Sequence, residues 1–477
     1  MAEEVLITLS LIVLVAAVLA VLSRAIRQPP IVAYILAGIL VGPMYFNIIG
    51  PSSSDLIKTL AQMGVAFLLF IVGLSLDVRV LRELGKVSIL AGACEITLVA
   101  TGGFVIAILL GFSTMTAIYL AIALAFSSTV MIVKILSDKK ELETLYGRIA
   151  LGILIIEDLV AAIVLMVAPM IKEGAGYAFV AQEFVIAILL IGVIFSFSHV
   201  FLNKIFDYLA QSQEILFLFG IAWVLILANL FNIFGFSLEI GALIAGMSLA
   251  SSRYNLEISG RVKPLRDFFV VLFFVFFGSQ LTGLVSWELI RKALIFSGFI
   301  FFGKPLIVMS VLRIFGYRKK VNFLVGTSLA QISEFSLILA MVVFGMGYMT
   351  KETLSLVIIV ALITIGLSSY SVYYSSAIYR KISKALRIFE EEDYLREERR
   401  KKYKVILFGY HRTGYKLLEV LKGSKMSFVV IDYNPKVIAS LSSKGIETIY
   451  GDASDEEFLE EVNLKDAALV ISTVPDT

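Results

Sequence analysis

Long apolar stretches separated by short polar connections fill the chain up to about Ser376, and from Tyr379 onward the pattern is that of a soluble protein. Each stretch is long enough, or nearly so, to cross about 30 Å of hydrocarbon as a helix. The pattern predicts thirteen spans, the second of them short, at residues 5–22, 31–42, 56–76, 87–110, 115–136, 147–170, 179–202, 214–231, 236–252, 267–284, 289–312, 321–346 and 353–377. We therefore expect a polytopic α-helical membrane domain over residues 1–379.

The composition supports a membrane protein and excludes several other classes. Hydrophobic residues make up 59% of the 477 positions, charged residues only 17%, and the mean hydropathy is +0.93, whereas about a quarter of the residues in a soluble domain are charged. The net charge of +3 gives no basic field for a nucleic-acid partner. The single cysteine, Cys94, excludes an intrachain disulfide, and His199 and His411 cannot form a zinc site without help from acids.

Basic residues in the predicted loops indicate the orientation in the membrane. If thirteen spans alternate from an outside N-terminus, the inward loops hold 17 Lys and Arg residues and the outward loops 5. This asymmetry is what the positive-inside rule requires. The sequence therefore predicts an external N-terminus and a cytoplasmic C-terminal part, in a multi-pass protein of the cell membrane.

The part after the last span has two sections. Residues 380–402 form a dense charged run with a thin apolar stripe, which predicts a linker helix, a solvated charged tether being the alternative. Residues 403–477 alternate between strand and helix, with strands expected at 404–408, 428–432, 447–450 and 468–473. This alternation predicts a parallel sheet covered by helices, as in a Rossmann-like α/β domain. Because the chain stops just after the fourth strand, we expect only the N-terminal part of such a domain.

Ionisable residues inside predicted spans are costly and therefore mark function or pairing. Glu157 and Asp158 are the only charges between Leu151 and Met166. Neighbours on a helix point about 100° apart, so both can border one polar cavity. Two carboxylates this close repel each other, which favours binding of a proton or a small cation. The alternative is a pair that only locks one helix to another.

Lys304 is the next charge that stands out deep in a predicted span, with Pro305 directly behind it. A buried lysine needs a carboxylate partner, and Glu157 or Asp158 is the candidate, being about equally deep. Pro305 removes a backbone hydrogen bond and favours local opening of the helix. The alternative is that Lys304 reaches an interface. Four weaker polar positions in other spans could each line the ion path, but we expect them to serve mainly in helix packing: Glu95, Asn229, Glu239 and Gln280.

Two spans, the fifth and the twelfth, are interrupted by polar residues. The fifth contains Ser127, Ser128 and Thr129, and the twelfth contains Gln331, Ser333 and Glu334. Broken helices are tolerated at membrane depth where they line a cavity, and their ends offer dipoles and carbonyls to ions. Spans five and twelve hold corresponding places if six-span inverted repeats flank a central seventh helix. Ordinary interhelical hydrogen bonding is the alternative for the serines and threonine, and Glu334 could equally be structural.

These features together resemble the monovalent cation/proton antiporters, in the Kef-like branch that carries a Rossmann-like RCK (TrkA-N) domain. The resemblance covers the whole chain and rests on specific strings: "FSSTV", "IIEDLVA", "FFGKPL", "AQISEF", "VILFGYHRTG", "VVIDYNP" and "YGDASD". It implies exchange of Na+ or K+ for protons by alternating access, with Asp158 as the essential carrier, a homodimer of two such chains, and no cofactor for transport.

Glu157 departs from the family pattern, because relatives hold Asp, Asn or Gln at this position. The acid together with Lys304 favours sodium, whereas the appended domain favours potassium. The resemblance implies that Lys304 pairs with the acids until a cation displaces it. The candidate ion and proton site comprises Glu157, Asp158, Lys304, Ser128, Thr129, Gln331 and Glu334.

The first strand of the C-terminal part is followed by Gly409, His411, Arg412 and Gly414, close to a dinucleotide fingerprint whose middle glycine is replaced by His411. Asp432 ends the second strand, where an acid can bind ribose hydroxyls. The resemblance adds Asp452 to this nucleotide site. The ligand is left open among AMP, ATP and NAD(H), with Arg412 and the helix N-terminus meeting phosphate. A ligand-free dimerisation module is the alternative.

Two other functions compete with antiport. A nucleotide-gated potassium channel would use the same cytoplasmic domain, but no TVGYG-like filter occurs, and thirteen spans with buried acids exceed what a pore needs. An oxidoreductase would need a second substrate domain, which the sequence does not contain. We therefore expect a transporter rather than an enzyme.

Overall fold

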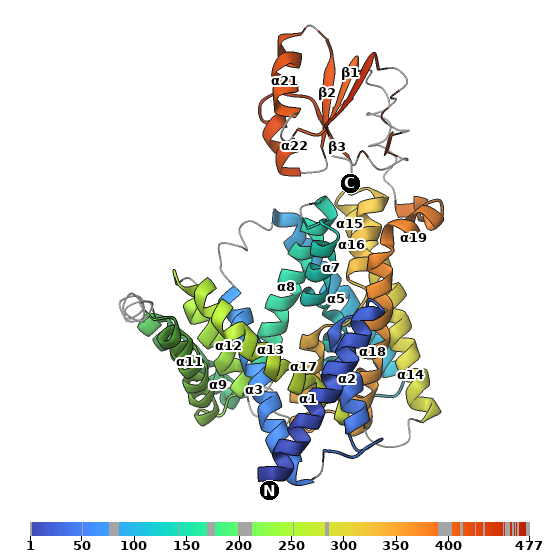
Figure 1. Cartoon of the computed structure of the whole chain (residues 1–477). Helices are drawn as coiled ribbons and strands as arrows, with labels where there is room; N and C mark the ends of the chain where they lie inside the picture. Colours follow the sequence, from blue (N-terminus) through green and yellow to red (C-terminus); the bar gives the residue numbers. More distant parts are fainter. Residues whose placement is uncertain are drawn as a thin grey trace. The chain divides into compact units, whose positions relative to one another are not determined.

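The structure is a computed structural model (Figure 1) and contains two compact units. One unit comprises Met1–Ile132, Gly152–Ile307 and Thr327–Tyr374, and the other Val133–Leu151, Val308–Gly326 and Ser375–Thr477. The residues that the structure describes are 2–49, 51–75, 85–142, 144–168, 177–198, 212–250, 252–281, 286–389, 403–410, 414–424, 426–432, 435–451, 453, 458–459, 462, 464 and 467–473.

The described residues before position 390 are mainly helical. Their bounds are α1 Ala2–Ala25, α2 Pro30–Val41, α3 Pro51–Ser75, α5 Gly85–Leu109, α6 Thr114–Ala125, α7 Thr129–Asp138, α8 Leu145–Val167, α9 Tyr177–Phe197, α11 Gln213–Ile233, α12 Leu238–Leu249, α13 Asn255–Ser279, α14 Trp287–Gly298, η3 Phe299–Gly303, α15 Lys304–Ile314, α16 Lys319–Ser328, α17 Glu334–Gly345, α18 Lys351–Tyr373, α19 Ser375–Ile382 and η4 Ala385–Phe389. Within the described residues, each of the thirteen predicted spans overlaps at least one helix, and the span at 289–312 overlaps α14, η3 and α15.

Eight of the described helical stretches are long and apolar enough to cross a membrane, and four apolar helices are shorter. Helix α13 carries charged residues in its first half and Pro264 within it. The expected helical membrane fold is confirmed. The second predicted span is the short helix α2, which begins at Pro30. Proline suits the first position of a helix because it has no amide hydrogen, and an amide at this position would have no acceptor within the helix.

Close packing between helices depends on glycine at a few positions. A Cβ placed on Gly38 of α2 would collide with the carbonyl oxygen of Val275 in α13, and one on Gly278 would collide with the carbonyl oxygen of Ile35. Only glycine permits this approach of two helix backbones, since any side chain would force them apart. Helices α2 and α13 thus form a tight pair within the first unit.

Two helices are interrupted, at the predicted places. Residues 126–128 separate α6 from α7, and residues 329–333 separate α16 from α17. Ser333 caps α17: its hydroxyl accepts a hydrogen bond from the Phe335 amide at 3.1 Å, and the Ser336 hydroxyl accepts one from the Ser333 amide. Thr364 in α18 accepts a hydrogen bond from the Ile332 amide at 3.4 Å. Side chains therefore satisfy backbone groups that the broken helix leaves free.

The C-terminal part contains a four-stranded parallel sheet, in the order β3-β2-β1-β4. The strands are β1 Val405–Phe408, β2 Phe428–Asp432, β3 Thr448–Tyr450 and β4 Leu469–Ser472, and the connecting helices include α21 Gly414–Gly423 and α22 Pro435–Ser442. Figure 1 shows α21 and α22 together on one side of the strands, where their leucines pack against Val405, Leu407 and Val430. The predicted Rossmann-like arrangement of strands is confirmed.

The segment between the last span and the sheet falls partly outside the described residues. Helix α19 ends at Ile382, and the short 3-10 helix η4 ends at Phe389. The rest of the predicted linker helix, residues 390–402, lies outside the described part of the chain, as do His411, Arg412 and Asp452.

Candidate functional site

The break between α6 and α7 is built around Glu157 of α8. The backbone amide of Ser127, free because the helix is interrupted, donates a hydrogen bond to Oε2 of Glu157. The Ser127 hydroxyl lies 3.1 Å from Oε1 of Glu157 and 3.2 Å from the carbonyl oxygen of Leu329, in the other helix break. The Glu157 side chain is fully buried. The irregular backbone thus supplies the donors that a buried carboxylate requires.

Lys304 lies against the same break. It follows the π-helical turn η3, and its amide donates to the carbonyl oxygen of Phe299. This local widening comes directly before Pro305, which has no amide hydrogen to continue the regular helix. The Lys304 ammonium donates to the carbonyl oxygen of Ala125 and, at 2.6 Å, to the hydroxyl of Ser127.

Lys304 also forms two ion pairs, and its side chain is fully buried. Its Nζ lies 3.2 Å from Oε1 of Glu95 and 3.5 Å from Oε1 of Glu157. The sequence favoured Glu157 or Asp158 as its partner. Among the described residues, the ion pairs of Lys304 are with Glu157 and Glu95 and not with Asp158.

Glu95 is the residue that sequence reasoning did not bring into the site. It lies in the middle of α5 with a side chain only 1% exposed. The sequence grouped it with residues that pack helices, although it is the one acid in the apolar run of α5. A signal was present, because an acid deep in such a run needs a basic partner, and Lys304 was the deepest base available.

Asp158 faces a different set of groups from Glu157, as expected for neighbours on a helix. Its Oδ2 accepts a hydrogen bond at 2.9 Å from the hydroxyl of Thr129, the first residue of α7. Asp158 is partly exposed, whereas Glu157 is buried. The structure therefore places Asp158 where the helix break and a more accessible space meet.

The second helix break contributes Glu334, the first residue of α17. Glu334 is 5% exposed, and its Oε2 has no hydrogen-bond partner among the described residues. Ser128 lies beside its carboxyl group, Asp158 is within electrostatic range of it, and the Arg266 guanidinium attracts it. Side-chain oxygen atoms therefore gather beside both breaks, from Ser128, Thr129, Asp158 and Glu334.

The Gln331 side chain forms hydrogen bonds that support the second break. Its side-chain amide donates to the carbonyl oxygen of Ser328 at 3.1 Å, and its Oε1 accepts a hydrogen bond from Ser368 in α18. Both ends of the amide are therefore engaged within the protein. The structure places Gln331 near the predicted site as a support for the break.

The charges at the breaks do not balance among themselves. Among the described residues at the breaks, four carboxyl groups outnumber the nearby cations, which are the ammonium of Lys304 and the guanidinium of Arg266 that acts on Glu334. The four acids are Glu95, Glu157, Asp158 and Glu334. In a medium of low dielectric constant, such an excess strongly favours binding of protons or a cation. The arrangement can therefore bind a monovalent cation and protons as alternatives.

The loop after β1 brings together the described members of the predicted nucleotide site. Gly409 has a φ of +85°, and a Cβ on Gly414 would collide with the carbonyl oxygen of Gly409, so both positions favour glycine. Oδ2 of Asp432 accepts a hydrogen bond from the Tyr410 amide at 2.9 Å. Asp432 therefore supports this loop, and its carboxylate is at the carboxyl end of β2, where ligands bind in such sheets.

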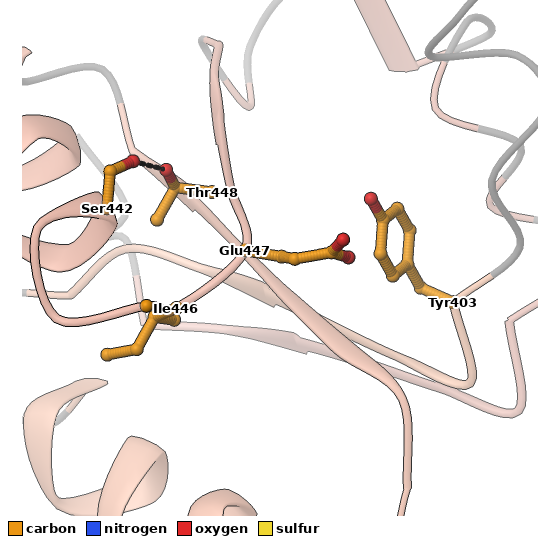
Figure 2. A pocket seen from close by; sticks show the side chains of 6 residues that line it. Tyr403, Ser442, Ile446, Glu447 and Thr448 are labelled. Atoms are coloured by element: carbon orange, nitrogen blue, oxygen red, sulfur yellow. Dashed lines mark hydrogen bonds between the residues drawn. The ribbon is translucent and has the colours of Figure 1, made fainter.

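A cavity of about 300 Å³ in the C-terminal part lies at the amino ends of the strands, opposite the loop that contains Gly409. Figure 2 shows Glu447 pointing toward the ring of Tyr403, and the hydroxyls of Ser442 and Thr448 are 2.7 Å apart. Tyr403 precedes β1, and Glu447 precedes β3. Because nucleotides bind beyond the carboxyl ends of the strands, this cavity is distinct from the predicted nucleotide site.

Comparison with family models matches both parts of the chain. Residues 10–372 match the transmembrane sodium/hydrogen exchanger family, and residues 405–477 match the TrkA-N domain.

Among individual proteins, the chain is 29% identical to the putative cation/proton antiporter YbaL of Escherichia coli, over 96% of this chain and 85% of that protein. It is 30% identical to K(+) efflux antiporter 5 of Arabidopsis thaliana over 69% of this chain, and it spans only 59% of that relative. The sodium proton antiporter MjNhaP1 of Methanocaldococcus jannaschii matches in fold with a TM-score of 0.51, at 16% identity, over 79% of this chain and 99% of that one.

Proposed function

The chain belongs to the sodium/hydrogen exchanger family of cation/proton antiporters, and we propose that it exchanges a monovalent cation for protons at Asp158. The observation that carries this proposal is the position of Asp158, which is partly exposed and is bound by Thr129 at the first helix break. The carboxylate is thus accessible to ions and still held by the interrupted helix.

Exchange follows from competition for one site. Asp158 binds either a proton or a cation, and the Thr129 hydroxyl and the unpartnered Glu334 oxygen add neutral and charged oxygen atoms for the cation. Because both ions need the same carboxylate, neither is carried together with the other. Alternating access of this site to the two sides of the membrane then couples the two gradients.

Glu157 and Lys304 are the second part of the proposed site. Glu157 is held by Ser127, and Lys304 balances the negative charge beside it. The cation is attracted to Asp158 and Glu157 together, and Lys304 offsets part of the negative charge that remains when the cation leaves. Ser128 and Gln331 shape the two breaks.

Potassium is the cation we propose first, because relatives named K(+) efflux antiporters match the membrane part and a TrkA-N domain follows it. Sodium is the second candidate, and the acid at position 157 together with Lys304 supports it, since sodium exchangers share this combination. These two ions differ in size and hydration, so a direct comparison separates them.

The test uses purified protein in liposomes that contain a pH-sensitive dye. Pulses of K+ or Na+ are expected to move protons without any added ionophore. Proton movement that appears only after a protonophore is added would identify a channel and contradict the proposal. The ion that gives half of the maximal signal at the lower concentration is the preferred substrate.

We further propose that the TrkA-N domain binds a regulatory nucleotide at Gly409, Gly414 and Asp432, with AMP, ATP and NAD(H) as the candidates. Calorimetry of the full chain with each nucleotide tests this. Heat from one of them is the expected result, and no heat from any would favour a ligand-free dimerisation module.

The orientation and assembly also belong to the proposal. The N-terminus is outside, the C-terminal domain is cytoplasmic, and two chains form a homodimer. Accessibility of a cysteine introduced beside Ala2, measured from each side of the membrane, tests the orientation, and the mass of the protein–detergent particle tests the assembly.

A further inference from the structure

The Lys304 ammonium has three hydrogen atoms to donate, and the structure accounts for two of them. One is directed to the carbonyl oxygen of Ala125 and one to the hydroxyl of Ser127, at 2.6 Å. Glu95 at 3.2 Å and Glu157 at 3.5 Å share the third. The two carboxylates therefore compete for a single donor.

The two acids depend on Lys304 to different degrees. Glu157 accepts a hydrogen bond from the Ser127 amide on one oxygen and lies 3.1 Å from the Ser127 hydroxyl on the other. Glu95 has no such backbone or hydroxyl donor among the described residues, and its side chain is 1% exposed. The ion pair with Lys304 is thus the main compensation that the structure offers to a charge on Glu95.

We propose that Glu95 is the principal counter-ion of Lys304 and acts as a positioning residue for the exchange site. Glu95 holds the ammonium beside the break between α6 and α7. Glu157 is then held by Ser127 rather than by Lys304, so it can contribute to cation binding without leaving Lys304 unpaired. The role in exchange rests on the proposed function, whereas the pairing rests on the geometry alone.

Melting of purified variants tests the pairing without any transport assay. Lys304→Gln leaves a buried acid without its base and is expected to melt well below the wild type. Adding Glu95→Gln removes that acid's charge and is expected to recover most of the loss, whereas adding Glu157→Gln recovers little. Greater or equal recovery with Glu157→Gln would overturn the proposal. If Lys304→Gln yields no folded protein, the same comparison is made on the amount of folded double variant.

The positioning role is tested in liposomes with Glu95→Gln alone. Lys304 must then pair with Glu157, so the cation has to displace it. We expect the cation concentration that gives half-maximal exchange to rise roughly tenfold, with a smaller change in the maximal rate. Glu239→Gln, an acid of α12 outside the cluster, serves as the matched control. An unchanged half-maximal concentration in Glu95→Gln would overturn the positioning role, even where the melting experiment supports the pairing.

Discussion

Thr129→Val removes one hydroxyl from the proposed exchange site and keeps nearly the same shape. The Thr129 hydroxyl donates to Oδ2 of Asp158 at 2.9 Å, and in the proposed site its oxygen is also a ligand of the cation. We take the loss of this ligand to cost as much as a hydrogen bond to a charged group, about 1.5–3 kcal/mol. Because Asp158 is partly exposed, water offsets part of the loss, and we take the lower end. The valine variant should therefore bind the cation about tenfold more weakly, the equivalent of about 1.4 kcal/mol.

The measurement is the half-maximal cation concentration for proton movement in liposomes. Thr129→Ser keeps the hydroxyl and is expected to remain within about threefold of the wild type, since a change in affinity that small is below 1 kcal/mol. Thr101→Val is a second control, because the Thr101 hydroxyl donates to a carbonyl oxygen within its own helix. Equal affinities for Thr129→Val and the wild type would refute the reasoning.

Two further changes test the framework that supports the sites. Gly278→Ala places a Cβ against the carbonyl oxygen of Ile35, and it should destabilise the membrane domain by about 1–3 kcal/mol, measured as a lower melting temperature. Gly298→Ala is the control, because Gly298 has open space around it. Equal melting temperatures of the two variants would contradict the close packing. Asp432→Ala leaves the Tyr410 amide without its acceptor and should speed hydrogen exchange of the amides in the loop after β1. Asp432→Asn keeps an acceptor and should preserve the slow exchange. Similar exchange rates in both variants would contradict the hydrogen bond between Tyr410 and Asp432.

The spans and the two helix breaks were predictable because hydrocarbon imposes a length and polarity on every crossing segment. Serines 127 and 128 and the polar group from Gln331 to Glu334 stand out in apolar runs, and the interruptions occur there. The strand pattern after residue 403 was equally plain, because buried parallel strands are short and apolar.

The partners of Lys304 were only half predictable. Sequence depth places Glu95, Glu157 and Asp158 in the apolar layer, but it does not say which helix faces which. The structure shows that α5 presents Glu95 to Lys304, while α8 directs Glu157 to the same cluster and Asp158 to Thr129. These choices depend on tertiary packing, which hydropathy alone does not contain.

The C-terminal site shows the same limit. The motif predicted that Gly409, Gly414 and Asp432 would gather at one loop, since the carboxyl ends of neighbouring parallel strands meet at one edge of the sheet. The hydrogen bond from the Tyr410 amide to Asp432 was not predictable, because it depends on the conformation of the loop. The acid thus has a structural task besides its proposed one.

The central claim is that Asp158 carries the exchanged ion, and the most direct test is Asp158→Asn in liposomes. The amide keeps the size of the side chain and can still accept a hydrogen bond from Thr129, but it cannot bind a proton or carry a negative charge. We predict that K+ and Na+ pulses no longer move protons, while the variant melts near the wild-type temperature. Cation-driven proton movement at the wild-type rate would contradict the account.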